Sequence, residues 1–351
     1  MDGVRVELIE DNLVIRFSSR VKCLSYAPYN GGLRETSCLL NHQVPKSFRK
    51  KPETELQSAI EELALPSDTV GFLTAASVKN YSQKSVRVNG KEVLALCTVG
   101  LSNARGVGES SENSSTINTF VVVEQTLNEQ ALVNALATAV EAKALAMFLL
   151  DVRSVTSSKP AVGTSTDALA VVTLGRGKAL RYAGSATKVG SAIGKSVFEC
   201  VKSGVAREAS VVTRLCERGV TLDALFEAAK EGVVGKRPKG LKKRFMRELK
   251  NALSDPNVCA LICAAMRLDD EASEGLVPNL KKSEYFKDSP KMLADEQIGE
   301  AIASYIAGTK GVNNFRYYDM LKPRVLRTLP MFLDDALCAL VGATMVRVYE
   351  S

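Results

Sequence analysis

The amino-acid sequence predicts an α/β domain, with a mixed sheet and helices, followed by an all-α domain. The first observation is length, because 351 residues exceed one typical compact domain. The second is that short apolar or β-branched runs alternate with helical patterns over roughly the first two hundred residues. The third is that strand-like runs stop near Arg207–Gly219, after which only helical patterns follow. We therefore expect one domain over residues 1–208 and a second over residues 219–351.

Turn signals separate the expected strands of the first domain. Glu10-Asp11-Asn12 and Asn89-Gly90 are typical of hairpin turns. The expected strands are Val4–Ile9, Leu13–Phe17, Cys23–Ala27, Leu39–Val44, Thr69–Ala75, Val86–Val88, Val93–Cys97, Phe120–Val123 and Ala168–Leu174. A first-turn proline, Pro52, predicts one helix, and two more are expected from Asn128 to Leu149 and over Lys188–Val201. Gly190 and Gly194 share a face of the last helix, where we expect close packing, most simply against a strand.

The second domain is expected to be helical throughout. Thr221 and Asp255 stand where N-caps are expected, and a proline follows Asp255 in the first turn. The expected helices are Ala206–Arg218, Thr221–Glu231, Leu241–Leu253, Pro256–Leu268, Pro290–Ala307 and Leu333–Tyr349.

Composition narrows the class of protein. With 46% hydrophobic and 24% charged residues, the chain can bury real cores. No run approaches the roughly 20 apolar residues that span a bilayer, and the N-terminus lacks a signal-peptide pattern, so we expect a cytoplasmic protein with no membrane span. Eight cysteines without CxxC pairs predict reduced core thiols. The sequence does not decide between a monomer and a homo-oligomer.

The single histidine, His42, limits the mechanisms available. Zinc hydrolases usually use two or three histidine ligands, so one histidine argues against a catalytic zinc site of that type. A Ser-His-Asp triad would have to use His42, and the sequence has no GxSxG motif to support one. We interpret His42 as structural.

A basic run lies at the start of the second domain, and its members are Lys236, Arg237, Lys239, Lys242, Lys243, Arg244, Arg247 and Lys250. Leu241, Phe245, Leu249 and Leu253 recur within it at helical spacing, which indicates that most of the charges form the solvated face of a helix. Few aromatic residues are interleaved, so no nucleic-acid partner is expected.

The central loop Thr98–Asn118 is the first candidate site. It is rich in Gly, Ser and Asn and lies between two expected buried strands, which would fix its ends while polar groups face outward. Residues Glu109–Ser115 alone are more typical of an unstructured hairpin tip. We therefore expect the site in Thr98–Asn103 and Thr116–Asn118, next to the strands.

A set of motifs in the first domain resembles the adenosylcobinamide amidohydrolase family. The motifs are Asn30-Gly31-Gly32, Asn41-x-x-Val44, Gly71-x-x-Thr74-Ala75, Thr98-x-Gly100-x-x-Asn103-Ala104, Thr116-Ile117-Asn118, Gly163-Thr164-x-Thr166-Asp167 and Tyr182-Ala183-Gly184. Ser115 departs from the glycine expected before Thr116. The resemblance implies a corrinoid substrate and hydrolysis of the amide that joins aminopropanol to adenosylcobinamide, giving adenosylcobyric acid.

Amide hydrolysis needs an activated nucleophile and a stabiliser for the oxyanion. Asp167 or Glu109 could activate water, Thr116 or Thr98 could act as nucleophile, and Asn103 or Asn118 with backbone N–H groups could hold the oxyanion. The alternative is that Asp167 caps a turn and the asparagines bridge strands. The residues expected to bind substrate are Asn30, Gly31, Gly32, Asn41, Thr74, Thr98, Asn103, Asn118 and Thr164.

Acidic residues in apolar helical segments mark a second candidate site. The set is Asp295 and Glu296 on a helix, Asp319 in an expected loop Phe315–Asp319, and Asp334 and Asp335 at the start of the last helix. Such acids repel one another unless a cation offsets them, and oxygen ligands without histidine or cysteine indicate Mg²⁺. Arg316 and Lys322 add positive charge for a phosphate, which together predicts metal-assisted hydrolysis of a phosphate monoester. Helix N-terminal acids favoured by the macrodipole would explain Asp334 and Asp335 alone.

The pattern Asp-Glu-x-x-Gly, Asn-Phe-x-x-x-Asp-x-x-Lys-Pro and Phe-Leu-Asp-Asp resembles soluble phosphatidylglycerophosphatase A and, most of all, its α-ribazole phosphatase relatives, from about Gly219 to the end. The resemblance implies that the five acids carry Mg²⁺. The sequence thus predicts a bifunctional enzyme of cobalamin salvage, whose second substrate is α-ribazole 5′-phosphate or the 5′-phosphate of adenosylcobalamin. The alternatives are a phosphatidylglycerophosphate phosphatase in the second half, and a non-catalytic corrinoid-binding module.

Overall fold

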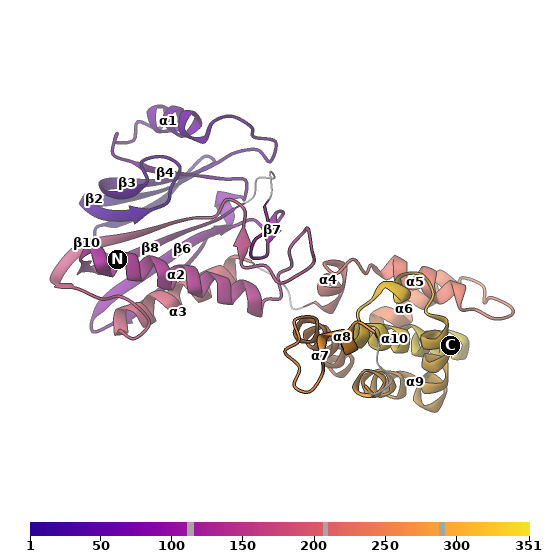
Figure 1. The fold of residues 1–351 in the computed structure, drawn as a ribbon. Coiled ribbons are helices and arrows are strands. Elements are labelled where there is room, and N and C mark those ends of the chain that lie inside the picture. Colours follow the sequence, from indigo (N-terminus) through magenta and orange to yellow (C-terminus); the bar gives the residue numbers. More distant parts are fainter. Residues whose placement is uncertain (111–115, 206–209, 288–291) are drawn as a thin grey trace. The chain divides into compact units, whose positions relative to one another are not determined.

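The computed structural model describes residues 1–110, 116–205, 210–287 and 292–351. The chain divides into two compact units, Met1–Glu208 and Ala209–Ser351. Figure 1 shows strands with flanking helices in the first unit and helices in the second. The mixed α/β class predicted for the first part and the helical class predicted for the second are both confirmed.

An eight-stranded sheet forms the first unit, with the order β4-β3-β2-β10-β8-β6-β5 and β1 paired to β2. Its strands are β1 (Val4–Ile9), β2 (Asn12–Ser25), β3 (Gly32–Gln43), β4 (Val70–Thr74), β5 (Ser82–Val88), β6 (Lys91–Val99), β8 (Ile117–Leu127) and β10 (Ala168–Leu180). The pairs β3–β4 and β8–β10 are parallel and the others antiparallel. A separate two-stranded ladder joins β7 (Ala104–Arg105) to β9 (Gly163–Thr164).

Strand β2 is shared by two layers of this sheet. Its first half pairs with β1 and β3, its second half pairs with β3 and β10, and the register with β3 shifts between Arg16 and Val21. The separate strand predicted at Cys23–Ala27 is therefore wrong: the irregularity bends β2 without ending it, and Ala27 lies outside it. Phe72 of β4 and Phe120 of β8 pack edge to face with ring centroids 4.8 Å apart, although their strands are not neighbours in the sheet. The sheet thus turns back on itself (Figure 1), and buried apolar side chains of β2, β3, β4, β6, β8 and β10 form one layer inside it.

Helices cover both outer faces of the folded sheet. Helix α1 (Pro52–Glu62) buries Leu56 and Ile60 against β2 and β3, and helices α2 (Glu129–Leu149) and α3 (Lys188–Gly204) cover the face formed by β6, β8 and β10. Asn128 and Thr187 cap α2 and α3 by accepting backbone N–H bonds, as their side chains favour. A short 3₁₀ turn, η1, spans Val78–Asn80.

Helix α2 is long and apolar enough, by length and composition alone, to cross a membrane. Within the described residues it is the one helix with these properties. Its Ala131, Leu132, Ala135 and Ala139 are fully buried in the core that the helix shares with the sheet and α3. A core helix of this kind passes the same test as a membrane span, so the observation is weak evidence against the expected absence of a span.

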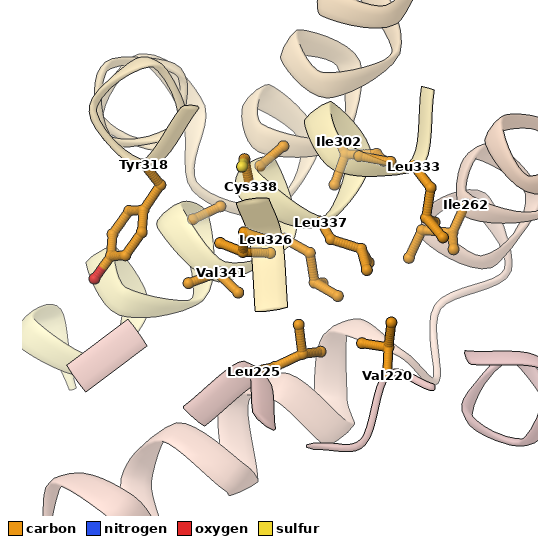
Figure 2. Packing of buried hydrophobic residues seen from close by; sticks show 14 of the residues in the cluster. Val220, Leu225, Ile262, Ile302, Tyr318, Leu326, Leu333, Leu337, Cys338 and Val341 are labelled. Atoms are coloured by element: carbon orange, nitrogen blue, oxygen red, sulfur yellow. The ribbon is translucent and has the colours of Figure 1, made fainter. Parts of the chain in front are cut away.

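The second unit is built around its last helix. Its elements are α4 (Val211–Cys216), α5 (Leu222–Glu231), α6 (Leu241–Ala252), α7 (Pro256–Ser273), α8 (Lys282–Tyr285), α9 (Ala294–Leu321), the 3₁₀ turn η2 (Arg324–Thr328) and α10 (Met331–Glu350). Figure 2 shows Leu333, Leu337 and Val341 of α10 among side chains from α5, α7, α9 and η2. Helix α10 is hydrophobic almost all round because the other helices enclose it.

Helix α9 departs from the prediction. The expected loop at Phe315–Asp319 is wrong, because the helix continues to Leu321 and buries Phe315 and Tyr318 in the core. The helix end predicted at Ala307 coincides with a kink, where Ala307 and Gly308 leave the helical conformation and Gly308 adopts φ +60°. The helix begins at Ala294, and Pro290 lies outside the described residues. Of the helix expected at Ala206–Arg218, only Val211–Cys216 is helical among the described residues.

Gly190 and Gly194 of α3 face different neighbours. A Cβ at Gly190 would overlap the carbonyl oxygens of Ala183 and Gly184, whereas a Cβ at Gly194 would meet only Thr138 of α2, at 3.6 Å. The close approach is therefore to a turn and to a helix, and the strand expected there is wrong.

This pair of glycines supplies a matched test of packing. Gly190→Ala should lower the free energy of unfolding by about 2 kcal/mol or more, because backbone atoms must shift. Gly194→Ala should leave it unchanged or raise it by up to about 1 kcal/mol through helix propensity. Urea unfolding of the two variants measures the difference, and equal effects would contradict the described packing.

Candidate functional site

A buried chain of polar side chains crosses the enclosed layer of the first unit. Asn118 of β8 donates through Nδ2 to Asn41 Oδ1 of β3 at 2.7 Å and to the Leu73 carbonyl oxygen of β4 at 2.8 Å. Asn41 Nδ2 in turn donates to Thr98 Oγ1 of β6 at 3.0 Å. These side chains lie on the same faces as the apolar residues of the enclosed layer because residues two apart in a strand share a face. The chain therefore joins both layers of the folded sheet.

Thr116 lies at one end of this chain. Its hydroxyl is 3.0 Å from Asn118 Oδ1 and 2.7 Å from the Thr166 carbonyl oxygen. Both neighbours are acceptors and the hydroxyl has one proton, so it donates to one of them and keeps lone pairs for another contact.

A cavity of about 290 Å³ opens beside Thr116. Its lining combines apolar side chains with the few polar groups of the strand ends, namely Tyr26, Pro28, Val44, Phe48, Pro52, Leu73, Thr74, Ala75, Thr116, Thr166, Asp167 and Ala168. This mixture of apolar walls and a few convergent polar groups is typical of small-molecule sites. We call it the Thr116 pocket.

Asp167 is held at the pocket by four donors. Its Oδ1 accepts from Ile117 N at 2.9 Å and from Thr164 Oγ1, and its Oδ2 accepts from Thr164 N at 3.1 Å and from Lys143 Nζ. A carboxylate has about four lone-pair positions, so these contacts fill them. This geometry favours an anchoring role for Asp167 over the activation of water.

Tyr26 contributes a phenol group to the lining of the Thr116 pocket. Burial, with a smaller effect from the nearby Asp167 charge, raises the pKa of its phenol to about 12. Tyr26 is consequently a neutral hydrogen-bonding group of the pocket at neutral pH.

Glu109 belongs to a neighbouring loop. Its carboxylate accepts hydrogen bonds from Ser154, Ser157 and Gly106 N, and those from the two serines are the main reason why its pKa is lowered. These bonds tie its own loop to residues 154–157. Glu109 is not among the residues that line the Thr116 pocket. The remainder of the expected hairpin tip, residues 111–115, lies outside the described residues.

The other predicted binding residues divide between the pocket and its supports. Thr74 lines the pocket, whereas Thr164 holds Asp167 and Asn103 donates to Ser165 Oγ at 2.6 Å.

Asn30, at φ +54°, donates to the Ser67 and Thr69 carbonyl oxygens. Gly31 is required sterically because a Cβ would overlap the Ala27 carbonyl oxygen, and Gly32 has φ +87°. The Asn30–Gly32 turn follows Tyr26 and Pro28, which line the Thr116 pocket, but its own residues are not in that lining.

Two kinds of residue escaped the sequence analysis. Lys143 is the only lysine or arginine of the Ala-rich helix α2. A single basic residue in such a helix was the one sequence signal that could have marked it as a site residue. Tyr26 and Phe48 of the pocket walls belong to none of the motifs that marked the site. His42 stays structural: its Nδ1 is 2.7 Å from Asn12 Oδ1, and burial lowers its pKa.

In the second unit, three of the predicted metal ligands converge. Carboxylate oxygens of Asp319, Asp334 and Asp335 all lie within 4.8 Å of one another. Burial, together with the charges of Asp319 and Asp295, raises the pKa of Asp335, and Lys322 Nζ pairs with Asp334 and lies 3.5 Å from Asp319 Oδ1. Among the described residues, Lys322 is the ion-pair partner of the buried Asp319 Oδ1, which makes no closer hydrogen bond. Three convergent carboxylates and no histidine or cysteine form an oxygen-only set, which fits Mg²⁺.

The remaining members of the predicted phosphatase set lie differently. Asp295 is buried and close enough to affect Asp335 electrostatically, but Glu296 is exposed. Arg316 is exposed and pairs with Glu300 at 2.7 Å. The structure thus groups Asp319, Asp334, Asp335, Asp295 and Lys322, and it leaves Glu296 and Arg316 on the surface.

A further acid, Asp269 of α7, holds the start of α10. Its carboxylate accepts from Phe332 N at 3.0 Å, Leu333 N at 2.9 Å and Tyr285 Oη at 3.0 Å, and burial raises its pKa to about 7. It satisfies N–H groups that the first turn of a helix cannot satisfy itself. The positions of Asp334 and Asp335 therefore depend on Asp269.

Comparison with known proteins identifies the class of the first unit. The family model described as adenosylcobinamide amidohydrolase (CbiZ) matches residues 2–212, which is more than half of the chain, so the chain belongs to this family. Membership supports a hydrolase activity. Among individual relatives, the adenosylcobinamide amidohydrolase of Methanosarcina mazei is 29% identical over 186 residues, covering 50% of this chain and 86% of the relative.

Two further likenesses are less informative. The uncharacterized protein MJ1330 of Methanocaldococcus jannaschii is 40% identical over 114 residues, covering 31% of this chain and 87% of the relative. The solved structure of the low temperature requirement C protein from Listeria monocytogenes is 22% identical with a TM-score of 0.37, covering 40% of this chain and 94% of that chain. A likeness at that score carries no inference about this chain.

The buried amide chain leads to a stability prediction. Asn118→Ala should lower the free energy of unfolding by about 2–4 kcal/mol, because Asn41 Oδ1 and the Leu73 carbonyl oxygen lose their donor inside the layer. Asn80→Ala, at an exposed position, serves as the control and should change it by less than about 0.5 kcal/mol. Denaturant unfolding of both variants makes the measurement; equal stability would show that the chain contributes nothing.

Proposed function

We propose that the first unit hydrolyses the aminopropanol amide of adenosylcobinamide to give adenosylcobyric acid. The observation that carries the proposal is the family match over residues 2–212, supported by the relative that bears the same activity in its name. A cavity of about 290 Å³ is much smaller than a corrinoid, so the pocket would take only the amide-bearing side chain while the ring lies outside.

The reaction adds water to the amide carbonyl carbon, the C–N bond of the tetrahedral intermediate breaks, and the amine leaves with a proton. Asn118 has both amide hydrogens engaged with the protein, so Thr116 is the better-placed group for contact with the reactants. Its hydroxyl proton goes to a protein acceptor, and its lone pairs would orient the attacking water.

Replacing the hydroxyl tests this role. Thr116→Val should lower kcat for aminopropanol release from adenosylcobinamide by about 100-fold, because water loses its fixed position. Thr116→Ser keeps the hydroxyl and should retain most of the rate. The full chain is assayed for aminopropanol and for corrinoid binding. A valine variant as fast as the wild type would remove Thr116 from the reaction, and wild-type protein that binds corrinoid without releasing aminopropanol would favour the binding-module alternative.

For the second unit we propose an Mg²⁺-dependent phosphatase that acts on α-ribazole 5′-phosphate or the 5′-phosphate of adenosylcobalamin. Support comes from the convergence of Asp319, Asp334 and Asp335, with Asp295 and Lys322 beside them. These acids would hold Mg²⁺, which supplies Lewis-acid polarisation of a phosphoryl oxygen. Lys322 would pair with the phosphate. The chain would thus be bifunctional, with amide hydrolysis in the first unit and phosphate ester hydrolysis in the second.

Two acidic residues make a matched pair for this proposal. Asp335→Asn should reduce Mg²⁺-dependent phosphate release by about 100-fold or more, because a ligand is lost. Glu296→Gln should retain the rate, since the side chain is exposed outside the cluster. Phosphate release is measured with α-ribazole 5′-phosphate and with phosphatidylglycerophosphate, and Mg²⁺ binding by calorimetry. Loss of activity in Glu296→Gln would return Glu296 to the set of Mg²⁺ ligands. Faster phosphate release from phosphatidylglycerophosphate than from α-ribazole 5′-phosphate would establish the lipid-phosphatase alternative.

A further inference from the structure

We propose that Lys143 is a positioning residue that acts through Asp167 to hold Thr116 in its place at the pocket. The inference rests on the proposed amide hydrolysis. It gives a role to a buried cation that lies outside the motifs and outside the pocket lining.

Both side chains of the Lys143–Asp167 ion pair are buried. Each side chain is 9% exposed, and Nζ contacts Oδ2 directly. Lys143 stands on α2, which covers the outer face of the sheet, whereas Asp167 precedes β10 at the edge of the pocket. The contact therefore passes between the outer helix and the end of a central strand.

Asp167 transmits this contact to Thr116 along two routes. On one route its Oδ1 accepts from Ile117 N, the amide that immediately follows Thr116, at 2.9 Å. On the other route both polar groups of Thr164 bind the carboxylate and hold the turn that contains Thr166. The Thr166 carbonyl oxygen lies 2.7 Å from Thr116 Oγ1. The backbone after Thr116 and the acceptor in front of its hydroxyl are thus both fixed by one carboxylate.

Gly163 leaves the room that this arrangement needs. A Cβ there would overlap Asp167 Oδ2 and would lie 2.8 Å from Lys143 Nζ. The glycine in the motif Gly163-Thr164-x-Thr166-Asp167 is consequently explained by the ion pair, without any contact between Gly163 and substrate. Lys143 supplies the donor that completes the fourth acceptor position of Asp167.

Stability alone is a poor reason for the pair. The cost of taking two charges out of water often equals what their attraction returns, so an apolar pair of similar volume would serve the core as well. Fixed direction is what an apolar pair cannot supply, because only a donor and a charged acceptor hold the carboxylate in one orientation. This reasoning separates positioning from simple packing.

The experiment compares variants of the full chain in aminopropanol release, with kcat and KM determined separately. Lys143→Met should reduce kcat at least 30-fold with KM within 3-fold, whereas Lys195→Met, at an exposed lysine of α3, should match the wild type. Thr164→Val is the milder variant in case Lys143→Met does not fold. It should reduce kcat about 10-fold, and Thr164→Ser should recover the rate to within 3-fold by restoring the hydroxyl.

A second readout does not need the activity. Hydrogen–deuterium exchange of a peptide that covers Ile117 should be at least 10-fold faster in Thr164→Val and in folded Lys143→Met than in the wild type. Unchanged kcat in folded Lys143→Met or Thr164→Val, with only a lower melting temperature, would overturn the proposal. If wild-type protein releases no aminopropanol, the proposed function fails, and the exchange rate at Ile117 then decides by itself whether Lys143 and Thr164 hold this segment.

Discussion

The hydrogen bond between Asn118 and Asn41 is the contact on which the site of the first unit depends. Its partners are 77 residues apart and belong to opposite layers of the folded sheet. Side-chain amides are costly to bury unless their donors and acceptors are satisfied, and here each amide finds partners on two sides. The apolar layer brings the strands together, and the amide chain specifies how their ends align. The Thr116 pocket lies at the end of that alignment.

The two candidate sites handle buried charge in opposite ways. In the first unit, Asp167 is balanced by Lys143 from the same fold, so the carboxylate is an internal support. In the second unit, Lys322 faces Asp319 and Asp334, while Asp335 and Asp295 bring further carboxyl groups close to them. In the first arrangement the lysine neutralises the carboxylate, so no metal ion is needed for charge balance. The second has more carboxylates than cations, which is the condition under which a divalent ion stabilises a protein site.

The sequence was informative where one local rule decided the outcome. Hairpin turns, N-caps such as Thr221 and Asp255, and the alternation of strands and helices predicted most elements of both units. It failed where tertiary contacts prevailed: Phe315 and Tyr318 extend α9 because the core buries them, and β2 continues through an irregularity. Polar residues at strand ends marked the region of the site, but their roles depend on pairings across the fold. Neither the saturation of Asp167 nor the exposure of Glu296 can be deduced from spacing.

The lining of the Thr116 pocket comes from segments that are far apart in the sequence. The hairpins β1–β2 and β5–β6 pair residues close in sequence, but the pocket needs β4 and β8 to face each other across the enclosed layer. Closing such long loops comes at an entropic cost before any contact compensates for it, so these contacts form slowly. A chain that ended before β8 would lack Thr166, Asp167 and Ala168 of the pocket lining. The pocket is therefore complete only when both layers of the folded sheet are present.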